Sequence, residues 1–251
     1  SSIYNNVGIE LLAEFYIGGG LNISYSNVKG GFDSIEYTDS YQGAITWGSG
    51  NIDVDPMFVD TANGNYHLLA SSQLINAGHP DSTDSDGTVA DMGTYPHLNT
   101  YSGPTWYVQT DGSDTDGTGS TDSPFSSIQS AINFATTDGD SVTVAAGTYV
   151  ENIVFTTNHN NNSIKVFGQG PETTIVDGDS ARHVVRIPSS TDPQVHLNGF
   201  TLKNGIAWPA ISGDGNNMGG GILSEGGTNI FENLIIENNR GSYGGVGGAF
   251  H

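Results

Sequence analysis

The chain has 251 residues, among them 36 glycines and 23 asparagines, and it contains no cysteine. Its formal net charge is −21, from 27 acidic and 6 basic residues, so it lacks the clustered Lys and Arg that bind nucleic acids and anionic lipids. The length allows one large or two small domains, disulfides are excluded, and no apolar run is long enough to cross a membrane.

The first half of the chain predicts short strands separated by turns. Residues 1–48 alternate short apolar runs with Gly and Asn, as in the run from Leu21 to Val28. Asn at a strand end tolerates the left-handed conformation and bonds neighbouring backbone groups, so these Asn residues are expected to be structural. The excess of turn-forming residues beside Val, Ile, Thr, Phe and Tyr predicts an all-β fold.

Residues 50–96 are dense in turns and are predicted to close one end of a β-structure. The apolar residues expected to cover that end are Met57, Phe58, Tyr66, Leu68, Leu74, Ile75, Met92 and Tyr95. Residues 97–105 are polar and contain Gly103-Pro104, a composition typical of a short linker.

The pattern restarts at Trp106 with a predicted strand and an acidic loop at 111–122. A single helix is predicted at about 123–136, with Ser123 as N-cap and Pro124 at its first position. Its apolar stripe consists of Ile128, Ala131, Ile132 and Ala135. Short strands are predicted after it, at 141–144, 153–155, 163–167, 174–176 and 184–187.

The later strands repeat. The segment from Gly199 to Asn204 aligns with Asn233 to Asn238 at an offset of 34 residues. A Gly-rich segment at 219–222 aligns less closely with 245–250, at an offset near 27. Strand-turn units with such periods are typical of stacked coils in a solenoid.

Two sets of motifs resemble the right-handed parallel β-helix proteins of the pectate-lyase-like superfamily, of the bacterial secreted type. Entry motifs lie at 123–132, 138–142, 146–152, 174–178, 199–202 and 219–222. Motifs similar to closing coils lie at 26–31, 53–58, 65–68, 75–78 and 90–93. The resemblance covers most of the chain and concerns its fold more than its activity.

The order of these motifs predicts two partial β-helix units. Residues 1–96 are expected to form the C-terminal coils and closing cap of one β-helix, and 97–105 the linker. Residues 106–251 are expected to form the N-terminal cap and first coils of a second β-helix. Because the chain begins and ends inside a Gly/Asn-rich pattern, it is expected to be a piece of a longer protein.

The resemblance implies how an enzyme of this superfamily would act, with bound Ca²⁺ and a Lys or Arg base. The available bases are Lys29, Lys165, Lys203, Arg182, Arg186 and Arg240. Lys203 and Arg240 follow predicted strands, but no carboxylate cluster is predicted at the same register on an adjacent coil. Adjacent Asp pairs and a Ser-His-Asp arrangement are not evident either, so no catalytic residue is predicted.

Calcium is the predicted cofactor. Asp84, Asp86 and Asp91 space carboxylates around a Gly turn as oxygen-rich loops do, although the distal Glu of an EF-hand is absent. The loop with Asp111, Asp114 and Asp116 is a second candidate. The alternative is that these Asp residues make local hydrogen bonds in solvated turns.

Exposed aromatic side chains are the candidates for stacking on a neutral sugar. Trp47, Trp208 and Tyr243 are predicted as weak glycan-binding residues, and the alternative for each is ordinary packing.

Together these patterns predict an extracellular, non-catalytic β-helix module, secreted or at the cell surface. It would serve as a stalk, adhesin or filament subunit, with glycan and Ca²⁺ as ligands, and its partners would be neighbouring β-helix units or copies of itself end to end. The alternative is a polysaccharide lyase or hydrolase that acts on acidic glycans through a groove largely outside this chain. An acidic surface suits a salty or calcium-rich medium, where cations screen it.

Overall fold

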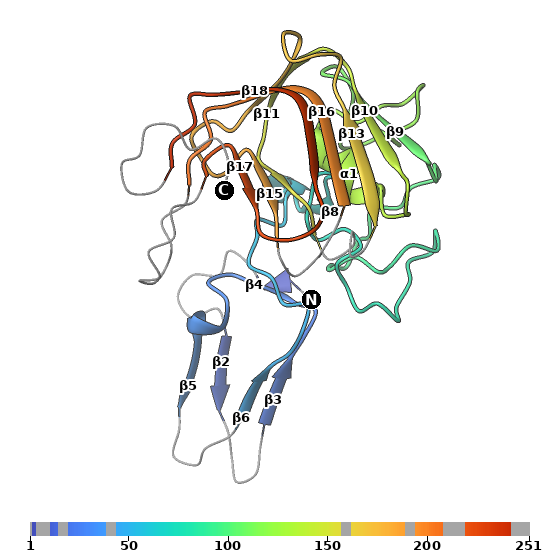
Figure 1. Ribbon diagram of the computed structural model, residues 1–251. Helices are drawn as coiled ribbons and strands as arrows, with labels where there is room; N and C mark the ends of the chain where they lie inside the picture. Colours follow the sequence, from blue (N-terminus) through green and yellow to red (C-terminus); the bar gives the residue numbers. More distant parts are fainter. Residues whose placement is uncertain are drawn as a thin grey trace. The chain divides into compact units, whose positions relative to one another are not determined.

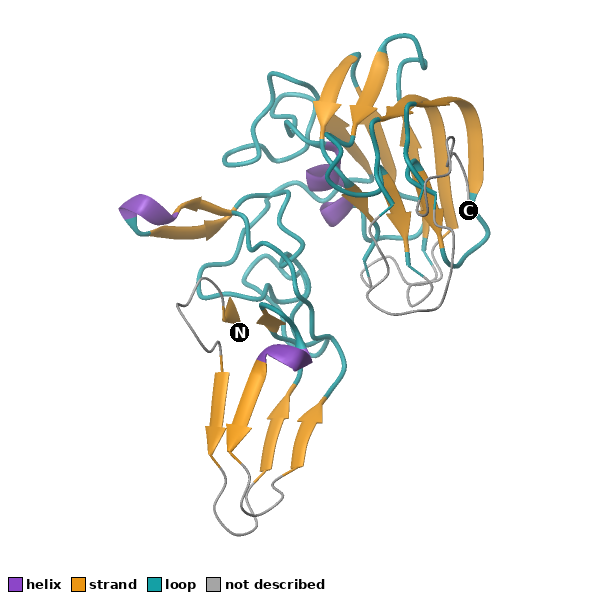
Figure 2. Cartoon of the chain, turned by 90° about the vertical axis from the view of Figure 1, so that its left-hand side faces the viewer, coloured by secondary structure: helices purple, strands orange, loops and turns teal. Residues whose placement is uncertain are grey.

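The computed structural model describes residues 2–3, 11–14, 20–38, 44–156, 162–188, 194–207 and 219–241. These residues form mostly β-strands, with a single α-helix among them, as expected for the predicted all-β class (Figures 1 and 2). The chain divides into two compact units, Ser1–Leu98 and Asn99–His251, and the division falls inside the segment 97–105 that was predicted as a linker.

The first unit contains two successive sets of three strands, and each strand of the second set pairs with one strand of the first. The first three are β1 (Ser2–Ile3), β2 (Leu11–Glu14) and β3 (Gly20–Ile23), and the next three are β4 (Asn27–Val28), β5 (Ile35–Thr38) and β6 (Ala44–Trp47). All three pairs are parallel: Ser2 lies beside Asn27, Leu11 beside Ile35, and Gly20 beside Ala44. The number of residues that separates paired positions is therefore nearly constant.

Apolar and amide side chains join the layers of the first unit. Ile23, Val28 and Ile35 are buried, and Leu21, Ile45 and Trp47 pack against them. The buried Asn27 amide donates from Nδ2 to the Val54 carbonyl and accepts the Val54 N–H at Oδ1, both at 3.0 Å. Buried backbone groups need such partners, which is the structural role expected for strand-end Asn.

The stretch after β6 contains an antiparallel hairpin of β7 (Phe58–Asp60) and β8 (Asn65–Leu68), linked by the 3₁₀ turn η2 (Thr61–Asn63). A second 3₁₀ turn, η1, is at Phe32–Ser34. Leu68, Leu74, Ile75 and Met92 are buried.

Three aromatic and apolar residues of that segment do not cover a core as predicted. Met57, Tyr66 and Tyr95 are 37%, 49% and 46% exposed. Tyr66 packs edge-on against Phe58 across the hairpin, with ring centroids 5.5 Å apart, and Tyr95 stacks on His67 at 4.7 Å. These rings therefore pack on one another at the surface of the unit.

The second unit is built on a seven-stranded parallel sheet (Figure 1). The strands β9 (Thr105–Val108), β10 (Ser141–Val144), β13 (Ser163–Phe167), β16 (Gln194–Lys203) and β18 (Ile230–Glu237) pair in that order. β11 (Gly147–Val150) and β14 (Thr174–Asp177) continue the sheet beside the second half of β16. A second parallel sheet consists of β12 (Ile153–Val154), β15 (Val185–Ile187) and β17 (Ile222–Ser224).

β16 and β18 each turn a corner without leaving the sheet. The corner of β16 is at Gly199, with φ at +87°, and the corner of β18 is at Asn233, with φ at +50°. The first half of β16 pairs with β13 and the second half with β14. Phe200 pairs with Leu234 and Lys203 with Glu237, which confirms the predicted alignment of these two segments; residues 245–250 of the second predicted alignment lie outside the described residues.

Inward-facing side chains from both sheets make the core of the second unit. Val142, Val166, Leu197, Phe200 and Leu202 are at most 2% exposed. The first three alternate with outward residues of their strands, and the last two follow the corner of β16. Burial of such side chains stabilises a fold by about 1.5–3 kcal/mol each.

The helix is shorter than predicted. α1 spans Ile128–Phe134, and its N-cap is Ser127, not Ser123. The reason lies in Phe125, whose N–H donates to the Tyr107 carbonyl at 3.0 Å and whose carbonyl accepts the Gln109 N–H at 2.9 Å. This pairing along β9 keeps the chain extended until residue 127, and the Ser127 side chain then accepts the Ser130 N–H.

Every residue of α1 is buried, including its polar ones. The Gln129 amide donates to the Val154 carbonyl at 3.0 Å and accepts the Val154 N–H at 2.7 Å, so it takes the place of a strand partner for β12. Phe134 packs with Phe125 and Trp106, at centroid distances of 5.4 and 5.6 Å. The helix therefore packs inside the unit beside β9, β10 and β12.

Candidate functional site

The first predicted calcium loop is held together by its own hydrogen bonds. Asp84 Oδ2 accepts the Asp91 N–H at 2.9 Å, and Asp86 Oδ1 accepts from the Thr88 N–H and hydroxyl at 3.1 and 2.7 Å. Asp91 accepts the N–H groups of Asn76 and His97, both at 2.7 Å. The structure thus brings Asp84 and Asp91 together, with carboxylate oxygens directed at backbone groups.

Asp91 is the most perturbed carboxyl of this loop. Burial raises its pKa to about 7, against the opposing effect of the Asn76 and His97 N–H groups, and the negative charges of Asp84 and Asp86 raise it further. A shift in this direction means that the folded protein favours the neutral acid.

The second predicted loop supports α1. Asp114 Oδ1 accepts the N–H groups of Ser126 and Ser127 at 2.9 and 3.2 Å. The Asp116 N–H donates to the Ser113 hydroxyl at 3.1 Å. Burial raises the pKa of Tyr149 to about 12, and the negative charges of Glu151 and then Asp111 add to this increase.

Glu151 completes the support of α1 and was not predicted. Its Oε1 accepts the Ile128 N–H at 2.8 Å and its Oε2 the Gln129 N–H at 2.9 Å. Asp114 and Glu151 together therefore satisfy four consecutive N–H groups around the start of the helix. Burial raises the pKa of Glu151 to about 7, against these two N–H groups and with a contribution from the charge of Asp114.

Within the ranges that the structure describes, no three His, Asp or Glu side chains gather in a group able to hold a metal ion. Calcium binding by the two loops stays a prediction. Of the aromatic candidates, Trp47 packs against the core of the first unit and meets Phe32 edge-on at 5.8 Å. Trp208 and Tyr243 lie outside the described residues.

Two rows of outward side chains follow the seven-stranded sheet across β9, β10, β13, β16 and β18. The first row consists of Thr105, Ser141, Lys165, His196 and Ile230. The second row consists of Tyr107, Thr143, Phe167, Asn198 and Glu232. We call these ten residues the outer face; on β9, β10, β13 and the first half of β16 their side chains alternate with the buried ones of the core.

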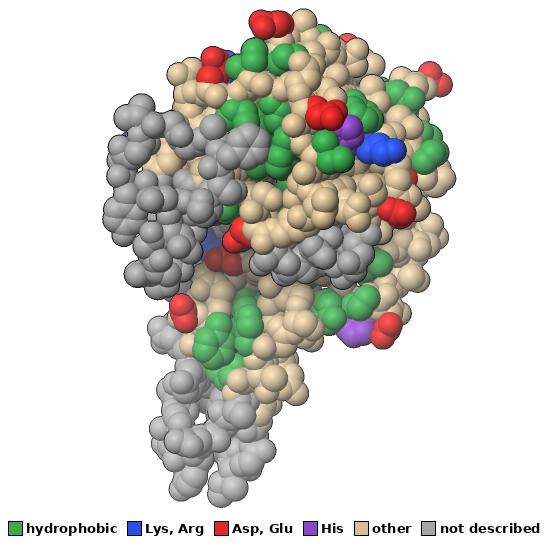
Figure 3. Space-filling model, in the orientation of Figure 1, with side chains coloured by type: hydrophobic (Ala, Val, Ile, Leu, Met, Phe, Trp, Pro, Cys, Tyr) green, Lys and Arg blue, Asp and Glu red, His purple; other side chains and the backbone are tan. Residues whose placement is uncertain are grey.

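Polar groups of the outer face converge on Glu232. His196 Nε2 and Asn198 Nδ2 lie 3.0 and 3.1 Å from its Oε2, and Phe167 meets the His196 ring edge-on at 5.3 Å. Lys165 is the row partner of His196 on the other side. Figure 3 shows an acidic, a histidine and a basic side chain next to one another over β18, β16 and β13.

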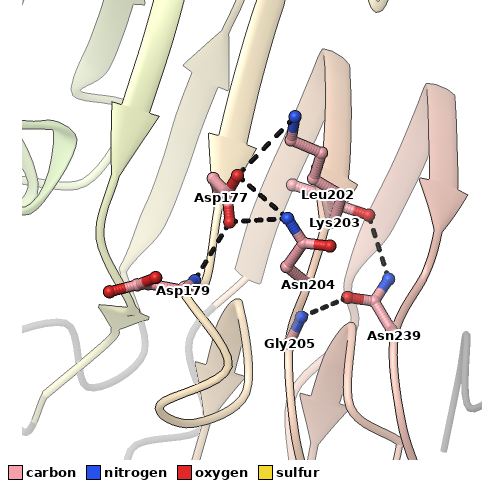
Figure 4. Close-up of polar contacts among 7 residues, drawn as sticks. All are labelled: Asp177, Asp179, Leu202, Lys203, Asn204, Gly205 and Asn239. Carbon is pink, nitrogen blue, oxygen red and sulfur yellow. Dashed lines mark hydrogen bonds and ion pairs between the residues drawn. The ribbon is translucent and has the colours of Figure 1, made fainter.

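A second polar group lies where β14, β16 and β18 end (Figure 4). Val150, Asp177, Lys203 and Glu237 are consecutive partners in one row. Lys203 Nζ is 3.6 Å from Asp177 Oδ2, and the Asn204 amide donates to both Asp177 oxygens at 2.9 Å. Single carboxylates, Asp177 and Glu237, therefore flank Lys203 at its register, one on each adjacent strand.

The surroundings of Asp177 stabilise its charged carboxylate form. Burial acts to raise the pKa of Asp177, but hydrogen bonds from Asn204 and the Asp179 N–H, with the charge of Lys203, outweigh it and lower the pKa below its ordinary value. Beside this group, Asn239 donates to the Leu202 carbonyl at 2.9 Å and accepts the Gly205 N–H at 2.7 Å. Lys203 Nζ thus lies beside a carboxylate in an ion pair.

The sequence contained only part of the signal for these groups. Lys165 and His196 each lie between two apolar residues of their strand, and such alternation marks outward positions, whereas Glu232 is followed by Asn233 and lacks this pattern. Their meeting depends on the register of three strands, which sets Lys165 beside His196 and Asn198 beside Glu232. The stretch of chain between partners is longer from β16 to β18 than from β13 to β16, so no single repeat length places all of them.

No protein-family model, curated protein or solved structure matches the chain. Among the described residues, no helix is long and apolar enough to cross a membrane.

Proposed function

We propose that the chain folds as two partial right-handed parallel β-helix units and serves as an extracellular structural and adhesive module. The observation that carries the proposal is the parallel pairing of successive layers in both units, with a nearly constant interval between partners throughout the first. Parallel pairing between successive layers of three strands is typical of a β-solenoid. The first unit would be a closing end and the second an opening end.

A structural role is supported by how the polar side chains are used. The carboxylates of Asp91, Asp114 and Glu151 accept backbone N–H groups. Lys203, the best-placed candidate base, is paired with Asp177. The base of a lyase must contact the proton of its substrate, whereas Lys203 Nζ lies beside the Asp177 carboxylate.

End-to-end assembly follows from the layered architecture that we propose. In the second unit β18 extends the sheet by one parallel strand beside β16. A solenoid built of such layers can be continued by the layers of another chain. Copies of the chain, or neighbouring β-helix units, are the proposed partners, and a secreted or cell-surface location is proposed with them.

The test compares activity with assembly. The full chain is incubated with pectate and alginate, with and without Ca²⁺, and unsaturated products are followed by ultraviolet absorbance, while sedimentation velocity follows size against concentration. We expect no product and a growing series of oligomers. Calcium-dependent product formation that Lys203→Ala abolishes would replace this proposal with the alternative of an acidic-glycan lyase. A chain that stays monomeric at every concentration would remove the end-to-end assembly.

A further inference from the structure

We propose that the outer face binds a neutral glycan chain that runs across the strands, with Phe167 as its stacking platform. This inference rests on the proposed adhesive function and adds the location of the site and the class of ligand. Its starting point is the group of Phe167, Lys165, His196, Asn198 and Glu232 on the outer face.

The polar groups of this site are held in place before any ligand arrives. Glu232 Oε2 lies within hydrogen-bond distance of His196 Nε2 and Asn198 Nδ2, at 3.0 and 3.1 Å, so the carboxylate has a fixed direction. The His196 ring also packs edge-on against Phe167. A fixed arrangement reduces the entropy that is lost on binding.

The chemistry of the site suits hydroxyl groups. A sugar hydroxyl both donates and accepts, so it can donate to the Glu232 carboxylate and accept from the Lys165 ammonium. Phe167 and Tyr107 lie in the same outward row and are half-buried residues, and the apolar faces of sugar rings can pack on aromatic rings. Aromatic rings beside planar polar groups are the combination that a neutral saccharide requires.

Charge favours a neutral ligand over an acidic one. The site itself combines Lys165 and Glu232, which carry opposite charges, whereas the whole chain has a formal net charge of −21. A polyanion that extended beyond Lys165 would meet an excess of carboxylates and be repelled. A neutral chain has no such penalty.

The geometry of the sheet favours an extended chain. The five strands of the outer face are about 4.8 Å apart, so the rows span roughly 19 Å. Because equivalent positions recur at this spacing, successive sugar units along a chain can meet successive strands. Affinity is therefore expected to rise from trisaccharide to hexasaccharide.

The experiment is isothermal titration calorimetry of the full chain with cello-, xylo- and manno-oligosaccharides, and with polygalacturonate for comparison. The variants are Phe167→Ala and Glu232→Ala, with Phe167→Tyr to retain the ring. Arg186→Ala is the matched control, because Arg186 is an exposed residue of the other sheet, ion-paired with Glu225 at 3.0 Å. Thermal unfolding of each variant is measured alongside, so that a loss of fold is recognised.

The expected result is binding of at least one neutral series, weakened about tenfold or more by either Ala variant and restored by Phe167→Tyr. Arg186→Ala should bind as the unaltered chain does. Binding that folded Phe167→Ala and Glu232→Ala retain would place the site elsewhere and overturn the inference, as would the absence of neutral-glycan binding or a preference for polygalacturonate. None of these results contradicts the proposed structural function. That function is contradicted by a different result, the cleavage of pectate or alginate by the chain.

Discussion

Asparagine and acidic side chains at the strand ends bond backbone groups of neighbouring layers. Asn27 bonds Val54, Asn51 donates to the Ile23 carbonyl at 2.8 Å, and Asn239 donates to the Leu202 carbonyl. Turns expose N–H and C=O groups that strands would otherwise pair, and an amide can serve one of each at once. The abundance of Asn and Asp is therefore explained by the backbone groups at the corners, which need hydrogen-bond partners.

Glu151 provides a test at the residue scale, because its folded pKa of about 7 lies above the ordinary value of 4.5. Between these values the folded protein holds a proton that the unfolded chain releases, so stability falls as pH rises, on the order of 1 kcal/mol per pH unit. Glu151→Gln cannot release that proton. We expect its free energy of unfolding, relative to the unaltered chain, to rise between pH 4.5 and 7 and then to level off.

Urea unfolding at several pH values measures this difference. Glu172→Gln removes a carboxylate from an exposed turn and should follow the unaltered chain throughout. A relative stability of Glu151→Gln that falls with pH would mean that the Ile128 and Gln129 N–H bonds outweigh the burial of the carboxylate.

At the scale of elements, β16 and β18 depend on a left-handed residue at their corners. Gly199 has φ at +87°, and a Cβ there would lie 2.9 Å from the Gly168 carbonyl oxygen. Asn233, at the same position of β18, has φ at +50°, which Asn tolerates better than other side chains. The corner at Gly199 therefore needs Gly, because the backbone of the preceding layer comes this close.

Gly199→Ala tests this corner. We expect it to lower the free energy of unfolding by about 1–3 kcal/mol, because it combines a strained φ with a backbone contact that is too close. Gly93→Ala is the control, since its added Cβ would meet no atom within 4 Å and its φ is not positive. Equal midpoints of unfolding in urea for the two variants would contradict the argument.

Most elements of the second unit could be predicted from sequence. The Val- and Ile-rich runs at 141–144 and 163–167 are strands as expected, because β-branched residues between turn formers favour extended chain. The start of α1 could not be predicted, since Ser123-Pro124 is a good local signal that the pairing of Phe125 with β9 overrides. β11 was missed because Gly147 and the exposed Thr148 and Val150 weaken its apolar pattern.

The polar groups of the sheet could be predicted less well than the strands. Lys203 was recognised as a candidate base, but its neighbours in the row come from two other strands, Asp177 from β14 and Glu237 from β18. The stretch of chain that leads back to Asp177 is shorter than the one that leads on to Glu237, and such unequal distances cannot be read from one repeat length. Local patterns predict which residues face outward, and only the register shows which of them meet.

At the scale of the whole molecule, the dominant feature is the excess of acidic residues, which number 27 against 6 basic ones. Like charges repel, and salt screens them over about 10 Å at 0.1 M. The excess disfavours the compact chain at low ionic strength and is consistent with the proposed extracellular setting.

Raising sodium chloride from about 10 to 150 mM at pH 7 is expected to raise the thermal midpoint of unfolding, because screening relieves repulsion in the folded chain. The same series at pH 4 is the control, since the sequence pI is about 4.1 and the net charge there is close to zero. A midpoint that salt leaves unchanged at pH 7 would show that the acidic residues are already compensated in the fold.

The unequal chain lengths between paired strands have a consequence for how such a protein can change. Val142 of β10 pairs with Val166 of β13 after a short connection, whereas Val185 of β15 pairs with Ile222 of β17 after a much longer one, and both pairs are parallel. The corners can therefore accept insertions or deletions while the lateral alignment of side chains stays the same. Evolution can lengthen such a connection, and so reshape the surface, without rebuilding the core beneath it.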